Sequence, residues 1–422
     1  MEQAGPHRDG VGGRPRRRSW DVVLTTLLVI GTVVGVALFV VRPWSDDDEP
    51  LPSLRPGTSP DQVRSLSIDF GIVTDPETDW GAVSRNLAAA HATTVNLNAG
   101  RVEFTAFDWP EHPEAAADEG VDHLAAAVRT LHESPDGDPR QVNLIVDAFV
   151  PRWIEEDPSI AGVAADGTRS EYTASATQLA EGEVGDRLVA YVEALGERYD
   201  PTAIEVTELF LNDYSFGDDD LALFREMTGA DDWPRTSTGA IDTTAPEIGQ
   251  WRSEVVAGLL NRMRAALDGV DGDGGEIGLV LDVRVDWEDP AAGQPGSGQD
   301  YQVLLDSVRD LRLQLWAYVG RPVRPATDVE RLTAALRDAG YDMARFVISV
   351  GLWGDGPADD AGTISPAALD GAVRSAATNG ITDVNVTPYS LMTDAHWEVL
   401  RTAWSDAAPT STSPAESPPA SD

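Results

Sequence analysis

Short β-prone runs alternate with helical patterns along most of the chain, and this alternation constrains the fold more than any other feature. The β-prone runs cover residues 66–73, 93–100, 141–150, 203–213, 276–287, 311–320, 346–354 and 383–391. The clearest helical patterns cover residues 121–133, 182–199, 251–267, 328–339 and 366–378. Such alternation is typical of a parallel sheet covered by helices. The sequence therefore predicts an α/β fold, a (β/α)8 TIM barrel, over residues 62–405.

A doubly wound open sheet is the alternative arrangement of the same elements. Open sheets usually have fewer strands and often carry a glycine-rich turn after the first strand. Here the first run is followed by IVTDPETDW, which contains no glycine. We therefore favour the barrel.

The barrel prediction turns many polar side chains toward the interior. Side chains along a barrel strand alternate between the helix layer and the interior. In the fifth run, Leu279, Leu281 and Val283 form the outer aliphatic set. By this alternation the polar and aromatic residues that face the interior or the mouth include Asp69, Asn98, Asp147, Asp282, Arg284, Asp286, Trp316, Tyr318, Trp353 and Tyr389. Barrel enzymes place their sites at the carboxyl ends of the strands, so we expect a site there.

The fourth run ends in TELFLNDYSFGDDD, residues 207–220. Alternation along this run turns Asp213 inward and Glu208 toward the helices, where an unpaired carboxylate is costly. Either a β-bulge turns Glu208 inward or an arginine meets it, and we favour the bulge. The aspartates at 218–220 have a simpler role, because acids suit the first turn of the helix that follows.

Carboxylates, amides and aromatic rings make up the predicted site, and the chain contains neither lysine nor cysteine. Their absence excludes Schiff-base catalysis, thiol chemistry and cysteine-ligated metal sites. The histidines form no HxH or HExxH pattern, so we expect no metal and no other cofactor. The remaining set suits a sugar, because aromatic faces stack on sugar rings and two carboxyl groups can flank a glycosidic bond.

LFLNDYSFGDDD resembles the end of the fourth strand in glycosyl-hydrolase-like barrels of bacterial surface proteins, where an acidic pair and a tyrosine close the strand. Trp251 and Arg252 are similar to a W-R pair at the start of the fourth helix. The layout of residues 62–405 is also distantly similar to the hydrolase domain of poly-N-acetylglucosamine deacetylases. The resemblance implies a catalytic acid at Asp213, with Tyr214 beside it in the substrate site. Asn212 stands where the other acid is expected, which leaves open whether the site is active and whether Glu208 supplies the missing carboxylate.

Residues 22–41 read VVLTTLLVIGTVVGVALFVV and carry no charge, and about 20 such residues span a bilayer as a helix. An arginine-rich stretch precedes them and acids follow, which favours a cytoplasmic N-terminus. A cleaved signal peptide is the alternative, but its apolar core is usually shorter and no A-x-A-like site follows. We expect a cytoplasmic segment over residues 1–21, a single-pass membrane helix, a linker over 42–61, an extracellular barrel and a disordered tail over 406–422.

The net charge of −40 repels phosphate polymers, so nucleic acid is not an expected partner, whereas a polysaccharide or oligosaccharide is. Our first hypothesis is a membrane-anchored glycoside hydrolase that acts on a cell-wall or extracellular polysaccharide. Its acid, and its base or nucleophile, are expected among Asp147, Glu208, Asp213, Asp282 and Asp286. A non-catalytic sugar-binding barrel, serving as a receptor or wall tether, is the alternative that Asn212 favours. A scaffold that only positions partners is the third hypothesis.

Overall fold

The computed structural model describes residues 51, 54, 60–135, 139–270, 276–355 and 362–405. The predicted cytoplasmic segment, membrane helix and tail, and most of the predicted linker, lie outside the described residues. Among the helices of the described part, none combines the length and hydrophobicity that spanning a bilayer requires.

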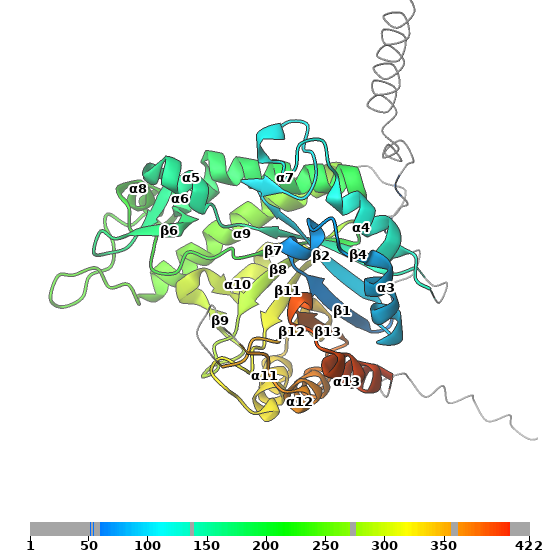
Figure 1. Cartoon of the computed structure of the whole chain (residues 1–422). Coiled ribbons are helices and arrows are strands. Elements are labelled where there is room, and N and C mark those ends of the chain that lie inside the picture. The colour runs from blue at the N-terminus through cyan, green and yellow to red at the C-terminus, as the bar shows by residue number, and fades with distance from the viewer. Residues whose placement is uncertain are drawn as a thin grey trace, which may run out of the picture. The chain divides into compact units, whose positions relative to one another are not determined.

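Parallel strands close into a barrel (Figure 1), which confirms the predicted fold. Each barrel strand pairs with the next one along the chain, and β1 pairs with both β2 and β13, which closes the ring. The short strand β3 (Phe104–Thr105) adds to β2 as an antiparallel edge. The eight barrel strands are β1 (Val63–Ile68), β2 (Thr94–Arg101), β4 (Gln141–Asp147), β7 (Ala203–Thr207), β8 (Gly278–Arg284), β11 (Leu311–Trp316), β12 (Phe346–Gly351) and β13 (Asp383–Thr387).

Helices cover the outside of the barrel because each presents an apolar stripe to the strands. The outer helices are α3 (Trp80–Ala89), α4 (His123–His132), α7 (Glu183–Tyr199), α9 (Pro246–Gly269), α10 (Tyr301–Ser307), α11 (Ala326–Asp338), α12 (Pro366–Ala376) and α13 (Asp394–Ser405). In the helix α7, for example, the buried residues include Val184, Leu188, Val192 and Leu195, which recur at helical spacing. The sequence pattern located α4, α7, α11 and α12 to within two residues at each end, and α9 begins five residues before its predicted start.

Several strands end earlier than the sequence predicts. β7 ends at Thr207, although the β-prone run continues to residue 213. β1 ends at Ile68, and the last residues of its predicted run form the short helix α2 (Phe70–Val73) instead. Leu209 and Leu211 are 1% and 0% exposed, although neither lies in a strand. Buried turns at the carboxyl end of the barrel therefore use the same apolar residues as strands do, and periodicity cannot separate them.

A hairpin and short helices decorate the carboxyl end of the barrel and lie at the left of Figure 1. The segment after β4 contains α5 (Pro151–Glu156), the hairpin strands β5 (Ala161–Val163) and β6 (Arg169–Ala174), and α6 (Ala176–Ala180). The segment after β7 contains α8 (Asp218–Thr228), and the segment after β8 contains β9 (Gly293–Gln294) and β10 (Gln299–Asp300).

The hairpin is held against the chain that follows β7. The amide of Phe216 donates to the carbonyl of Val163 at 2.7 Å. A Cβ atom on Gly162 would lie 2.4 Å from the carbonyl oxygen of Tyr214, so only glycine permits this approach. The hairpin thereby becomes a fixed wall beside the barrel mouth.

Candidate active site at the barrel mouth

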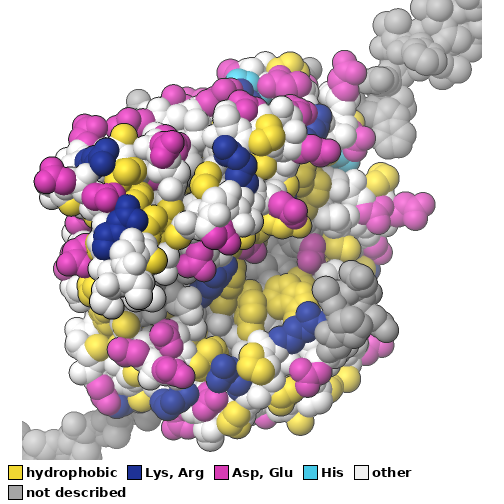
Figure 2. Space-filling view, turned by 90° about the vertical axis from the view of Figure 1, so that its left-hand side faces the viewer, with side chains coloured by type: hydrophobic (Ala, Val, Ile, Leu, Met, Phe, Trp, Pro, Cys, Tyr) yellow, Lys and Arg dark blue, Asp and Glu magenta, His cyan; other side chains and the backbone are white. Residues whose placement is uncertain are grey.

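A pocket of about 200 Å³ opens at the carboxyl end of the barrel. All eight barrel strands contribute side chains to it, and carboxyl groups, amides and aromatic rings dominate its lining. Figure 2 shows the face that carries the hairpin and the short helices, hollowed near its middle, with hydrophobic side chains along the hollow. This is the place where barrel enzymes carry out their chemistry.

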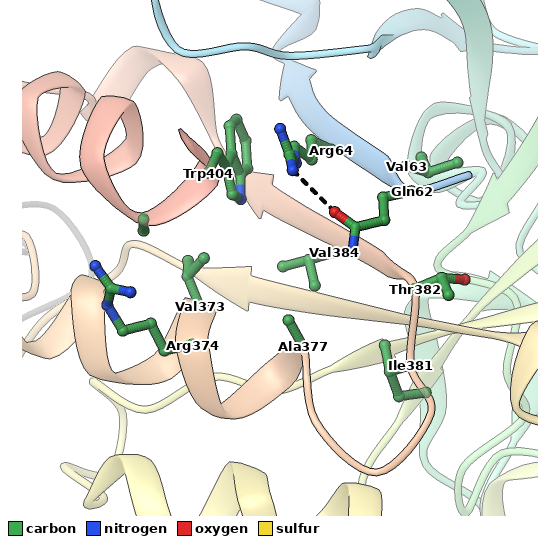
Figure 3. A pocket seen from close by; sticks show the side chains of 11 residues that line it. Gln62, Val63, Arg64, Val373, Arg374, Ala377, Ile381, Thr382, Val384 and Trp404 are labelled. Carbon is green, nitrogen blue, oxygen red and sulfur yellow. Dashed lines mark hydrogen bonds between the residues drawn. The ribbon is translucent and has the colours of Figure 1, made fainter. Parts of the chain in front are cut away.

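Another cavity, at the amino-terminal ends of β1 and β13, lacks the groups that such chemistry needs (Figure 3). Its lining is mainly aliphatic and includes Arg64, Arg374 and Trp404, but no carboxylate and no histidine. General acid and base catalysis therefore has no candidate group there.

Two buried carboxyl groups, Glu205 on β7 and Asp282 on β8, form the floor of the mouth pocket. The side-chain amide of Gln314 donates to both of them, with 2.8 Å to Asp282 Oδ1, and Asn96 Nδ2 donates to Glu205 Oε2 at 3.0 Å. Burial, together with the charge of Asp282, raises the pKa of Glu205 well above its usual range. Burial raises the pKa of Asp282 as well, and the mutual repulsion of the two carboxylates favours the neutral form of Glu205.

Glu208 follows β7 directly and lines the mouth. β7 pairs with both neighbours without a register shift, so the predicted bulge is wrong. Instead, Glu208 adopts the left-handed region with φ 57°, which breaks the strand alternation at this residue. A left-handed conformation is costly for a residue other than glycine and concentrates at functional sites.

Burial raises the pKa of Glu208 to about 7, and the charge of Asp147 adds to the shift. The guanidinium of Arg284 acts in the opposite direction. A carboxyl group with this pKa holds its proton through much of the neutral range and can donate it, as a general acid must.

Asp147 ends β4 and faces the same pocket. Its Oδ2 atom lies 2.8 Å from Nη2 of Arg101, and its Oδ1 atom accepts from the amide of Phe149 at 2.9 Å. Burial raises the pKa of Asp147, and the Arg101 guanidinium opposes that shift. This pairing favours the charged form of Asp147 beside the neutral form of Glu208.

An irregularity in β2 brings Arg101 opposite Asp147. The register between β2 and β4 shifts between Asn98 and Gly100. Gly100 has φ 102°, and a Cβ atom there would lie 2.3 Å from the carbonyl oxygen of Phe104. A bulge that depends on glycine thus sets the ion pair at the mouth.

Three aromatic rings form one wall of the mouth pocket. Trp316 and Tyr318 stack with their centroids 5.6 Å apart and their planes 7° apart. The rings of Tyr318 and Trp353 lie 5.0 Å apart. The sequence predicted all three as interior residues, and all three line the pocket.

A second pocket of about 450 Å³ adjoins the mouth on the side of the β5–β6 hairpin, and Glu208 lines both pockets. Arg284 lies here, with its guanidinium 3.6 Å from the ring centroid of Phe210 and Nη1 donating to Asn212 Oδ1 at 2.7 Å. Tyr214 also lines this pocket. The predicted residues Asn212, Tyr214 and Arg284 are therefore neighbours of the mouth and do not line it.

The structure brings Asp69, Asn98, Asp147, Glu208 and Asp282 together in the mouth, as the sequence predicts. Asp69 Oδ2 also accepts from the amide of Ser390 at 3.0 Å, and Asn98 Oδ1 accepts from the amide of Gly100 at 2.9 Å. Asp69 thus also holds the chain that follows β13, and Asn98 supports the irregularity within β2.

Asp213, Asp286 and Tyr389 were expected to face inward, but none of them lines the mouth pocket. Asp213 is exposed and lines neither pocket, since the chain turns at Asn212, which has φ 45°. Asp286 Oδ1 accepts from the amide of Glu288 at 2.8 Å and closes a turn. The ring of Tyr389 packs on Trp397 at 6.1 Å.

Sequence reasoning missed three parts of the site. Glu205 was not among the predicted site residues, although its alternation with Val206 along the strand points it to the interior. Arg101 lies beyond an irregularity that alternation does not reveal. The hairpin was missed altogether, although Asp166-Gly167 is a strong turn signal for a hairpin.

No protein-family model and no curated protein matches the sequence. The glycoside hydrolase domain of PgaB (BpsB) from Bordetella bronchiseptica matches with a TM-score of 0.59 and 15% identity, covering 81% of this chain and 98% of that one. The catalytic domain of β-amylase from Paenibacillus polymyxa matches with a TM-score of 0.53 and 13% identity, covering 83% and 99%. β-Galactosidase from Marinomonas ef1 matches with a TM-score of 0.57 and 12% identity, covering 81% of this chain and 59% of that one. The chain is thus a distant structural match to the (β/α)8 barrels of glycoside hydrolases, and what it shares with them is the fold.

Proposed function

We propose that this protein is a glycoside hydrolase that acts on a polysaccharide, with Glu208 as the proton donor. The observation that carries the proposal is the pair of unequal carboxyl groups at the mouth. Glu208 has a pKa of about 7, and Asp147 is paired with Arg101. Burial raises the pKa of both groups, and Arg101 opposes that rise only at Asp147, so Glu208 is the better proton donor of the two.

In the cleavage of a glycosidic bond, the carboxyl groups of Glu208 and Asp147 each carry out one step. The carboxyl proton of Glu208 moves to the leaving oxygen as the bond from that oxygen to the anomeric carbon breaks. Asp147 either attacks the anomeric carbon or removes a proton from the water that attacks it. Asp282 is less suited to this second role, because Gln314 and Glu205 already occupy its oxygen atoms. The configuration of the first product distinguishes the two routes.

The aromatic wall supports a sugar as the substrate. Trp316, Tyr318 and Trp353 offer flat apolar surfaces, while Asp69 and Asn98 offer oxygen and amide groups to hydroxyls. We also propose that residues 22–41 anchor the protein in a membrane with the barrel outside the cell, so that a wall or extracellular glycan is the natural substrate.

The test is incubation of the full chain with a panel of wall and extracellular polysaccharides, followed by mass spectrometry of released sugars. Wild type and Glu226→Gln, a control at an exposed glutamate on α8, are expected to release the same products. Glu208→Gln and Asp147→Asn are each expected to lower the rate by at least about a hundredfold.

A non-catalytic sugar-binding barrel is the second candidate. Its supporting observation is that Asp213, the acid implied by the sequence resemblance, is exposed outside both pockets. Glycan binding without any release by the wild type, across the pH range 5–8, would favour this function and overturn the hydrolase.

A further inference from the structure

The second pocket has the features of a binding region for additional sugar units. Its wall is the β5–β6 hairpin, and it meets the mouth pocket at Glu208. A cavity of about 150 Å³ holds one benzene molecule, which has about half the heavy atoms of a sugar unit. By that measure a sugar unit needs about 300 Å³, so the second pocket, of about 450 Å³, has room for at least one sugar unit beyond the mouth.

An aromatic row leads from the rim of the second pocket toward Glu208. The ring of Phe149 lies 5.7 Å from Tyr172 on one side and 5.6 Å from Phe210 on the other. Phe210 is buried and covered by the guanidinium of Arg284, and Phe149 is half-buried. Tyr172 is different, because 53% of its surface is exposed.

The exposed ring of Tyr172 leaves a flat, partly apolar surface open to a ligand. The hairpin that carries Tyr172 is fixed by the Gly162 contact and by the hydrogen bond from Phe216, so the ring is presented on a rigid support. A flat amphipathic ring with few rotatable bonds on a rigid support is suited to bind at low entropic cost.

We propose that the second pocket binds the sugar units that adjoin the cleaved bond of an unbranched glycan chain, with Tyr172 as the stacking platform. This inference rests on the proposed function for the position of the cleaved bond, but the binding itself does not require hydrolysis. The protein then selects chains over single sugars, and Tyr172 determines that selection.

The test measures binding of unbranched oligosaccharides of increasing length, built from neutral, N-acetylated and acidic sugars, to the full-length Glu208→Gln variant by calorimetry. For at least one series, affinity is expected to rise about tenfold or more between the single sugar and the longer chains. Adding Tyr172→Ala is expected to remove this gain and leave the affinity for the single sugar unchanged. Tyr172→Phe keeps the flat ring and is expected to keep the gain.

Met227→Ala on α8 is the matched control, because Met227 is 41% exposed and lines neither pocket. Equal affinity for short and long chains in every series, or a gain that survives Tyr172→Ala, would overturn the proposal. The affinity for long chains could depend on Tyr172 while the wild type hydrolyses no glycan. That result would support this binding region and contradict the hydrolase, so the two proposals can fail separately.

Discussion

At the residue scale, Glu208 combines a left-handed backbone with a pKa of about 7. The ordinary pKa of glutamate, 4.5, is lower, so the folded protein binds this proton more tightly than the unfolded chain does. Below pH 4.5 this group does not lower the free energy of unfolding. As pH rises from 4.5 through about 7, that free energy falls, because the unfolded chain releases the proton more readily. The raised pKa of Glu208 corresponds to a loss of at most about 3 kcal/mol in the free energy of unfolding at high pH.

Glu208→Gln removes the carboxyl group, and with it the cost of burying a charged carboxylate at high pH. We expect the variant to be more stable than wild type at pH 8, by up to about 3 kcal/mol, and to differ little at pH 4.5. Urea unfolding at both pH values measures this difference. The exposed control Glu226→Gln is expected to show no such pH dependence, and a Glu208→Gln effect of the same size at both pH values would contradict the shifted pKa.

Arg101 acts through Asp147, which it holds at 2.8 Å. Arg101→Gln takes away the charge that opposes the effect of burial on the pKa of Asp147. We expect the acid side of the pH–rate profile to move up by about 1 pH unit. Arg85→Gln is the control, since Arg85 is an exposed arginine 3.8 Å from Asp79. An unchanged acid side in Arg101→Gln would mean that Asp147 does not act as the charged partner.

Alternation along the strands predicted residues that lie within a strand or at its end, such as Asp147, Asp282 and Trp316. It failed for Asp213, because left-handed residues at Glu208 and Asn212 interrupt the alternation and no periodic signal reveals them. The cost of a buried carboxylate did identify Glu208 as anomalous, although the expected cause, a bulge, was wrong.

At the element scale, strands and helices followed from local periodicity, whereas the loop that shapes the site did not. The β5–β6 hairpin depends on contact with the chain near Tyr214, about 50 residues away, and such contacts leave no local pattern. Its position beside the mouth could be known only from the structure.

Gly162→Ala tests whether the hairpin position matters. The added methyl group meets the carbonyl oxygen of Tyr214 at 2.4 Å, so the hairpin must move. We expect a loss of about 1–3 kcal/mol in unfolding free energy, together with weaker binding of long oligosaccharides. Gly258→Ala in α9 adds a methyl group with nothing within 4 Å and is expected to be neutral or stabilising. Unchanged glycan binding by Gly162→Ala would show that the hairpin is not part of the site.

At the scale of the whole molecule, the eight repeated strand–helix units made the barrel predictable from sequence, because each unit carries its own signal. The proposed membrane anchor, residues 22–41, lies outside the described part of the chain. Together with the proposed function, the barrel and the anchor describe an enzyme that is held in the membrane near its substrate.

Cell fractionation tests the tether. The full chain is expected in the membrane fraction after a high-salt wash, and added protease is expected to digest the barrel in intact cells. A variant that begins at Pro52 keeps the second compact unit of the chain and is expected in the soluble fraction. Full chain found in the soluble fraction would contradict the anchor.

The measurement that most directly tests the central claim is a carbon-13 NMR titration of the glutamate carboxyl groups, because it requires no knowledge of the substrate. Comparison with Glu208→Gln assigns the Glu208 resonance. The account predicts a midpoint at about pH 7 for that resonance. A midpoint near 4.5, the ordinary value, would mean that Glu208 carries no proton at neutral pH and is not the acid of this site.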